Sequence, residues 1–455
     1  MNEGRPIVIR ERERDAVLQS LHAGVVPKTG QQYIQVGRAG ELEALVKDID
    51  RIVDGGSTFR FIIGEFGSGK SFFLMLVRAV ALERKMVTLN ADLSPERRLL
   101  GSGGQARSLY GELVSNMATR AKPDGQALAS VVERFVTSAN EEAQSRSVDT
   151  NQIFNERFER LREMVGGYDF ATVIQKYWEG FEQNNAELQN NAIRWLRGEF
   201  TTKTEARNTL GVMTVIDNTN WYDYLKLLAK FVRMAGYTGL LVCLDELVNL
   251  YKLNHSISRN NNYEQLLRML NDSLQGSAGG IGWLLGGTPE FLLDPRRGLY
   301  SYPALQSRLA ENSFAVGGLV DRTGPVLRLA SLSSEDFYIL LTKLRNVYAR
   351  GNETKYLLPD EALTSFMDHC AQRIGDAYFR TPRNTIKEFI NLLSVLDQNP
   401  GISWESILND VRVAPEANPD LVPLPDDPLI HDQSPSSPAP SLGESNDDEL
   451  SSFKL

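Results

Sequence analysis

Residues 64–71 decide the fold, and they read Gly64-Glu65-Phe66-Gly67-Ser68-Gly69-Lys70-Ser71. This stretch fits the pattern G-x-x-x-x-G-K-[ST] and lies between an apolar run at 59–63 and a helical pattern at 71–84, the context that a phosphate-binding loop requires. Glycines allow positive φ angles, so backbone N–H groups can approach phosphate oxygens closely. Lys70 would place a positive charge at the β- and γ-phosphates, and Ser71 a hydroxyl on Mg²⁺. A structural glycine turn is the alternative, and the strand-to-helix context disfavours it.

A second motif lies at 239–246, where a fully apolar run ends in Asp245 and Glu246. A buried strand here would deliver both carboxylates to the edge of a sheet, beside the phosphate-binding loop. Asp245 could hold Mg²⁺ through water, and Glu246 could polarise the attacking water as a general base. An acidic pair is also common at a solvated helix start, where negative charge is favourable. Together the two motifs favour ATP as the bound nucleotide, with Mg²⁺ as its cofactor.

Two further apolar runs, at 86–90 and 281–288, bring the number of candidate strands to four. Because these runs alternate with helical patterns, we expect a parallel sheet with both faces covered. The predicted fold class is therefore α/β, an AAA+-type parallel sheet covered by helices, with a large helical insertion and a C-terminal all-α lid.

The chain divides into four expected parts. They are an N-terminal helical segment at 1–55, an ATPase core at 56–330 with a helical insertion at about 105–235, a helical lid at 331–412, and an acidic tail at 413–455. Helix-start signals at Ser333 and Pro359-Asp360 support the lid. The tail is rich in proline, serine and acidic residues and cannot bury enough apolar surface to offset its ordering entropy, so we expect disorder.

Three further positions are candidates for the reaction. Thr288 ends the fourth strand and could place a hydroxyl near the γ-phosphate, as sensor 1, or simply cap the next helix. Arg308 follows that strand and could act as an arginine finger towards a neighbouring subunit, although an arginine on a helix is usually a solvated charge. In the lid, Arg383 or Arg380 could reach the nucleotide as sensor 2.

The net charge of −9 is concentrated in the tail, where nine acids and one base contribute −8. The rest of the chain is nearly neutral, so the overall charge is uninformative about DNA. The base-rich positions are Arg97, Arg98, Arg157, Arg160, Arg162, Arg194, Arg197 and Lys203. Glutamates at 156, 159 and 163 interleave with several of them, which leaves DNA contact open.

Cysteine and hydropathy patterns exclude several other classes of protein. Cys243 and Cys370 have neither a metal-ligand spacing nor a disulfide pattern, and the four histidines form no cluster, so a zinc site or a catalytic triad has no support. No window reaches the ~18 consecutive apolar residues of a membrane span, and the first residues show no targeting pattern. We expect a cytoplasmic protein without a membrane partner.

Several short stretches accompany the two motifs. They are Val25-Val26-Pro27, Val36-Gly37-Arg38, Phe72-Phe73-Leu74, Asp92-Leu93-Ser94-Pro95 and Leu109-Tyr110. With the motifs, they resemble the BrxD-type ATP-binding proteins of bacterial BREX anti-phage defence systems over most of residues 5–400. The resemblance implies an AAA+ ATPase related in layout to origin-recognition loaders, with Gly37 and Arg38 near the nucleotide base and Phe72 among the nucleotide-binding residues.

The leading hypothesis is an ATPase that forms a homo-oligomer with ATP and remodels or loads a partner or DNA, together with other defence-system proteins. A nucleotide-gated scaffold, which would switch a partner surface without significant turnover, is the alternative. Glu246 favours turnover, because a protein that only binds nucleotide has no need of a general base. A small-molecule kinase is disfavoured by the Asp245-Glu246 pair and the long lid.

Overall fold

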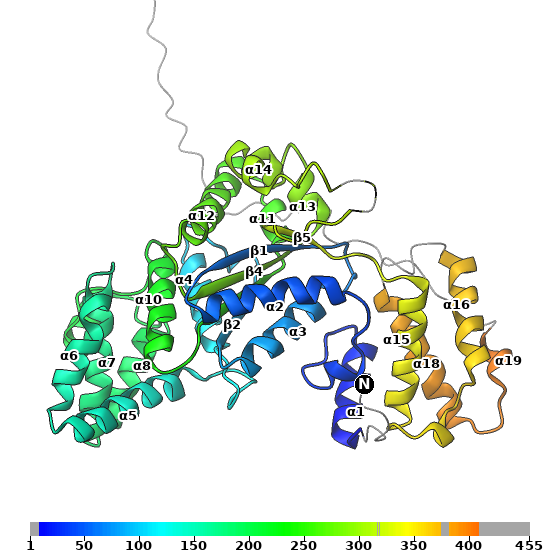
Figure 1. Cartoon of the computed structure of the whole chain (residues 1–455), viewed down its shortest axis with the longest axis horizontal. Coiled ribbons are helices and arrows are strands. Elements are labelled where there is room, and N and C mark those ends of the chain that lie inside the picture. The colour runs from blue at the N-terminus through cyan, green and yellow to red at the C-terminus, as the bar shows by residue number, and fades with distance from the viewer. Residues whose placement is uncertain (1–8, 316, 318, 375–381, 409–455) are drawn as a thin grey trace, which may run out of the picture.

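The centre of the molecule is a five-stranded sheet with the order β2-β3-β4-β1-β5, in which every pairing is parallel. The computed structural model describes residues 9–315, 317, 319–374 and 382–408 (Figure 1). The strands are β1 Thr58–Ile63, β2 Val87–Asp92, β3 Leu240–Asp245, β4 Ile281–Gly287 and β5 Val326–Arg328. The α/β prediction is confirmed. Sequence reasoning found four of these strands and missed β5, which has only three residues.

Both faces of the sheet are covered because successive strand residues point to opposite sides. Phe61 and Ile63 of β1 enter one core cluster, and Ile62 enters the other. The face that carries Ile62 packs on α2 and α3, and the opposite face packs on α4, α10 and α12. The bounds are α2 Ala39–Val53, α3 Lys70–Glu83, α4 Gln105–Ser115, α10 Trp221–Met234 and α12 Ser256–Leu274.

The predicted helical insertion extends from the sheet as a separate lobe, at the left of Figure 1. Its helices are α5 Leu128–Arg146, α6 Thr150–Arg162, α7 Gly167–Glu182, α8 Ala186–Leu196 and α9 Lys203–Leu210. Phe135 lies at its centre, with its ring centroid 5.7 Å from Phe154, 5.2 Å from Phe158 and 5.0 Å from Phe231 of α10. The buried residues of this lobe form one continuous cluster with one face of the sheet, so its packing is joined to that of the core.

In the C-terminal part, the described residues from 334 onward form helices and connecting segments without a strand, and they lie on the other side of the sheet, at the right of Figure 1. Its helices are α15 Ser334–Tyr348, α16 Asp360–Ile374, α18 Pro382–Gln398 and α19 Trp404–Leu408. α15 begins at the predicted cap: the Ser333 hydroxyl accepts the Asp336 N–H at 3.1 Å, and the Asp336 carboxylate accepts the Ser333 N–H at 3.1 Å. The N-terminal helix α1, Glu11–His22, packs beside α18 and α15.

Short elements complete the chain. They are η1 Gln31–Tyr33, α11 Val248–Tyr251, α13 Pro289–Leu293, η2 Leu299–Ser301, α14 Pro303–Leu309 and η3 Glu353–Lys355. Cys243 and Cys370 are buried and free, and burial raises the pKa of each thiol to about 12. Among the described residues, no helix is both long and apolar enough to cross a membrane. The predicted disordered tail at 413–455 lies outside the described residues.

Candidate functional site

The glycine-rich loop connects β1 to α3 and carries the backbone angles that its glycines permit. Gly67 has a φ of 72° and Gly69 a φ of 85°, a region that residues with a side chain rarely enter. The Lys70 ammonium donates to the carbonyl oxygens of Gly64 and Glu65, each at 2.9 Å. The loop is thus wrapped closely around its own lysine.

Asp245 ends β3, beside the first turn of α3. Its Oδ2 accepts the hydroxyl of Ser71 at 2.5 Å, and its Oδ1 accepts the backbone N–H of Glu246 at 2.9 Å. Glu246 follows with a φ of 59°, a left-handed conformation that is uncommon for residues other than glycine. The two motifs, 174 residues apart in sequence, therefore meet through a direct side-chain contact.

Gly286 of β4 is the residue that gives Asp245 its place. A Cβ atom at Gly286 would lie 2.2 Å from Asp245 Oδ1 and 3.1 Å from Leu74 Cδ1. Only a residue without a side chain fits between them. Sequence reasoning missed this role, because the pair Gly286-Gly287 gives no sign of what faces it.

β4 lies between β1 and β3, so its end is flanked by both motifs. Thr288 follows β4, is buried, and lines the same pocket as Lys70 and Asp245. Its hydroxyl accepts the N–H of Phe291 at 3.4 Å and caps α13. The capping alternative is thus observed, together with a position beside the loop, and the sensor role stays a prediction.

The pocket continues from the loop into an apolar end built by distant parts of the chain. Its apolar lining comes from Val25, Val26, Pro27, Ile34, Leu332, Leu340 and Ile386. Sequence reasoning did not identify the lid residues of this set. A polar end at the phosphate-binding loop and an apolar end of this kind match the two halves of a nucleotide, which are a charged phosphate chain and a flat base.

Three other predicted ligands line this pocket, whereas Gly37 is not among its described lining residues. Arg38 lines it and donates to the Ser68 carbonyl oxygen at 2.5 Å. Arg383, at the start of α18, also lines it, with its guanidinium carbon 5.3 Å from the centre of the Phe66 ring. Phe72, on α3, lines the pocket and packs against the lid cluster. Arg380 lies outside the described residues.

Arg308 is separate from these residues. It is exposed on α14, donates to Asn271 Oδ1 at 2.8 Å, and is not among the described residues that line the pocket. It is therefore not part of the nucleotide site of its own chain as the described residues form it. A role in the reaction would require a second copy.

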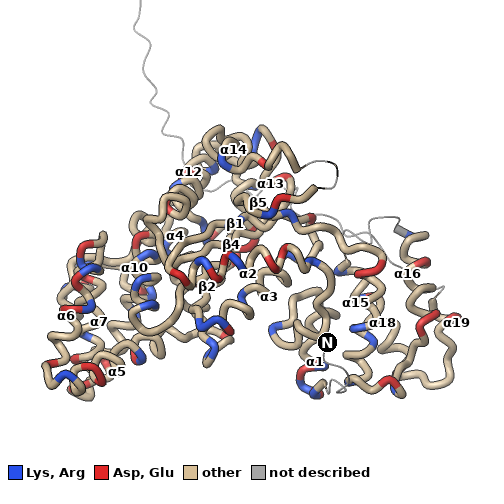
Figure 2. Tube along the Cα trace, in the orientation of Figure 1, with Lys and Arg blue, Asp and Glu red and all other residues tan. Residues whose placement is uncertain are grey.

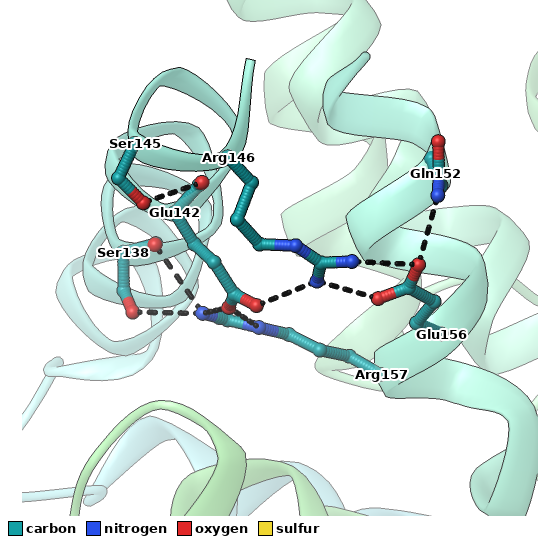
Figure 3. A network of polar contacts seen from close by, with 7 residues as sticks. All are labelled: Ser138, Glu142, Ser145, Arg146, Gln152, Glu156 and Arg157. Carbon is teal, nitrogen blue, oxygen red and sulfur yellow. Dashed lines mark hydrogen bonds and ion pairs between the residues drawn. The ribbon is translucent and has the colours of Figure 1, made fainter. Parts of the chain in front are cut away.

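Acidic and basic residues are interspersed along the insertion (Figure 2). Figure 3 shows how closely two arginines there are held: Arg157 reaches Glu142 at 2.6 Å, and Arg146 reaches Glu142 at 3.0 Å and Glu156 at 2.7 Å. The two arginines lower the pKa of Glu142 through hydrogen bonds. Arg194 and Arg197 likewise pair with acidic side chains. These ion pairs occupy arginines that were candidates for DNA contact, and such contact stays a prediction.

A parallel sheet with a glycine-rich loop before a helix and a pocket at its strand ends is typical of nucleotide-binding α/β proteins. The chain belongs to the family described as BREX system ATP-binding protein BrxC/D, which matches residues 9–412. The predicted family is confirmed, and membership assigns the chain an ATP-binding role in this defence system. Comparison with curated proteins gives no match.

Proposed function

We propose that this protein is an AAA+ ATPase that hydrolyses ATP with Mg²⁺. The observation that carries the proposal is the contact of Ser71 with Asp245 at 2.5 Å, with Glu246 next in the chain and all three residues in one pocket. A protein that only binds nucleotide needs the phosphate loop, but it does not need a general base at this place.

The donor set fits Mg²⁺, because a hydroxyl and a carboxylate are the hard oxygen ligands that this ion prefers. Ser71 and Asp245 would hold it, directly or through water. When bound, the ion supplies positive charge that offsets the charge of the phosphate oxygens. Lys70 would exchange its two loop carbonyls for phosphate oxygens and add a second positive charge.

Glu246 would orient the attacking water and accept its proton. A bond forms between the water oxygen and the γ-phosphorus, while the bond from that phosphorus to the bridging oxygen of the β-phosphate breaks. The products are ADP and inorganic phosphate. Thr288, at the end of the strand between the two motifs, would donate its hydroxyl hydrogen to a γ-phosphate oxygen.

Phosphate release by the wild type and by Glu246→Gln tests this proposal. We expect Glu246→Gln to bind ATP with wild-type affinity and to lose phosphate release by about 10²-fold or more, the range of general base catalysis. A wild type that binds ATP and releases no phosphate would contradict hydrolysis and favour the nucleotide-gated scaffold instead.

We further propose that the hydrolysing form is a homo-oligomer that remodels or loads a partner or DNA within the defence complex. Support comes from Arg308, which is exposed and is not among the described residues that line its own pocket. As a finger in trans, it would contribute about 10³-fold or more in rate. Mass in solution with and without ATP tests the assembly, and a gel shift that weakens steeply with salt tests DNA contact.

A further inference from the structure

The N-terminal segment at 9–36 belongs structurally to the lid. Ile9, Val17, Leu18 and Ile34 are buried in the same cluster as the lid helices. Arg14 Nε donates to the Tyr348 carbonyl oxygen at 2.9 Å, and the Lys343 ammonium donates to the carbonyl oxygen of Gln35. In Figure 1, α1 lies directly beside α15 and α18. We call the segment 9–36 and the helices of 334–408 the lid body.

The next helix, α2, belongs to the sheet instead. Ile49 and Ile52 are buried in the sheet cluster. Asp48 forms a buried ion pair with Arg60 of β1, with Nε–Oδ2 at 2.5 Å. The chain thus passes from the lid body to the sheet between Ile34 and α2, at Gly37 and Arg38, whose φ angles are 62° and 58°.

The second passage lies between β5 and α15. Leu329 is buried in the sheet cluster, and Leu332 is buried in the lid cluster. Only Ala330 and Ser331 separate them. Among the described residues, the lid body and the sheet are therefore joined by two short chain passages, one at 37–38 and one at 330–331.

Arg38 is part of the first passage, and its side chain contacts the second passage and the phosphate-binding loop. Its Nη2 donates to the Ser68 carbonyl oxygen at 2.5 Å and to the Ala330 carbonyl oxygen at 3.4 Å. Its Nε is buried without a hydrogen-bond partner. Burial lowers the pKa of the Arg38 guanidinium, and the carboxylates of Glu41 and Asp336 oppose this shift. The contact with Ala330 is near the distance limit of a hydrogen bond, so it is the first to break if the passages move.

We propose that Arg38 is a positioning residue that couples the phosphate-binding loop to movement of the lid body about the two passages. This proposal rests on the proposed nucleotide site, but not on hydrolysis. The pocket is lined from both sides, by Lys70 and Asp245 of the sheet part and by Val25, Leu340 and Ile386 of the lid body. A nucleotide that contacts the loop at Ser68 and Gly69 would displace Arg38 through its hydrogen bond to Ser68. Arg38 would in turn change its contact with Ala330.

Hydrogen–deuterium exchange with and without ATP tests the coupling, in a Glu246→Gln background that excludes turnover. In this background we expect ATP to slow exchange both at 64–71 and at 329–345. With Arg38→Ala added, protection at 64–71 should remain, while protection at 329–345 should fall to less than half. Arg38→Lys should be intermediate, because one ammonium replaces a forked guanidinium.

Arg322→Ala is the matched control, since Arg322 also pairs with α2, through Glu41 at 3.2 Å, and does not line the nucleotide pocket. It should leave both protected regions unchanged. The coupling would be overturned if both Arg38 variants kept full ATP protection at 329–345. It would also be overturned if they lost protection equally at 64–71 and 329–345. If ATP did not protect 64–71 in the Glu246→Gln protein with Arg38 unchanged, this result would instead contradict the nucleotide site. In the hydrolysing protein, Arg38→Ala should lower kcat by about 10-fold.

Discussion

Replacing Gly286 by alanine should remove most of the proposed ATPase activity, although no residue of the two motifs is itself substituted. The new Cβ would lie 2.2 Å from Asp245 Oδ1, and real Cβ contacts essentially never fall below 3.0 Å. One of the two groups must therefore move by at least about 0.8 Å. Leu74 Cδ1, at 3.1 Å from the same Cβ, restricts movement of the alanine towards α3, so we expect Asp245 to move.

The shift disturbs two contacts at once, because Asp245 accepts the Ser71 hydroxyl through Oδ2 and the Glu246 N–H through Oδ1. A misplacement of about 1 Å in catalytic groups costs about 10²-fold in rate, which corresponds to about 2.7 kcal/mol of activation free energy. We expect kcat for phosphate release at saturating ATP and Mg²⁺ to fall by this factor. The Kd for ATP should change by less than about threefold, because Lys70 and the loop stay in place.

Gly111→Ala is the control, because Gly111 lies inside α4 and has room for a side chain. Its Cβ would lie at an ordinary 3.5 Å from the nearest atom outside its own helix, the carbonyl oxygen of Arg197. It should keep full activity and gain about 0.5–1 kcal/mol of stability. The effect of Gly286→Ala should also nearly vanish in an Asp245→Ala background, where the clashing oxygen is absent. A Gly286→Ala protein with kcat within threefold of wild type, or with an equal loss in both backgrounds, would refute the reasoning.

Three other changes test the fold and the pocket. Asp48→Asn should lower the free energy of unfolding by about 3–5 kcal/mol in urea denaturation, because it leaves the Arg60 charge buried without its partner. Lys70→Ala should weaken ATP binding by about 10- to 100-fold in calorimetric titration, since a charged hydrogen-bond donor to the phosphates is lost. Phe135→Ala should cost about 3–5 kcal/mol in the same denaturation assay, because it opens a cavity at the centre of the insertion.

Each of these changes has a control. Glu43→Gln, on the same helix as Asp48 but in an exposed pair with Lys47, should leave the free energy of unfolding nearly unchanged, and equal losses for the two variants would contradict the role of burial. Wild-type ATP affinity in Lys70→Ala would argue against the pocket. Phe181→Ala, at a half-exposed ring that stacks on Trp178, should lower stability much less than Phe135→Ala. A Phe135→Ala loss no larger than that would show that the insertion does not depend on this core.

The four strands that the sequence reveals are those of six or seven residues, most of them buried. Every residue of β1, β3 and β4 is buried, and most of these residues are apolar, so the three strands stand out from the helical patterns around them. β5 has three residues, one of them exposed, which is too short for a pattern. The order of the strands is not encoded locally, because it depends on pairing between segments far apart in the chain.

The candidate site divides in the same way. The loop and the acidic pair are each a short continuous stretch of sequence, so the residue types and spacing within each stretch identify them. The apolar end of the pocket is assembled from Val25, Leu340 and Ile386, which are scattered over the chain and are ordinary apolar residues when taken singly. Nor does the sequence reveal that α1 packs with the lid. The buried residues of α1 are Val17 and Leu18, and their partners in the lid lie hundreds of residues away in the chain.

The left-handed backbone at Glu246 has a consequence for how this protein can be stabilised. A residue with a side chain held at a φ of 59° costs of order 1–3 kcal/mol relative to a relaxed conformation, and glycine would largely avoid that cost. A selection for heat resistance alone would therefore be drawn to Glu246→Gly, and the variant that it recovered would melt later and no longer have the carboxylate. Thermal tolerance and the proposed turnover compete for this one position, so a screen for robust variants of this protein has to include an activity measurement.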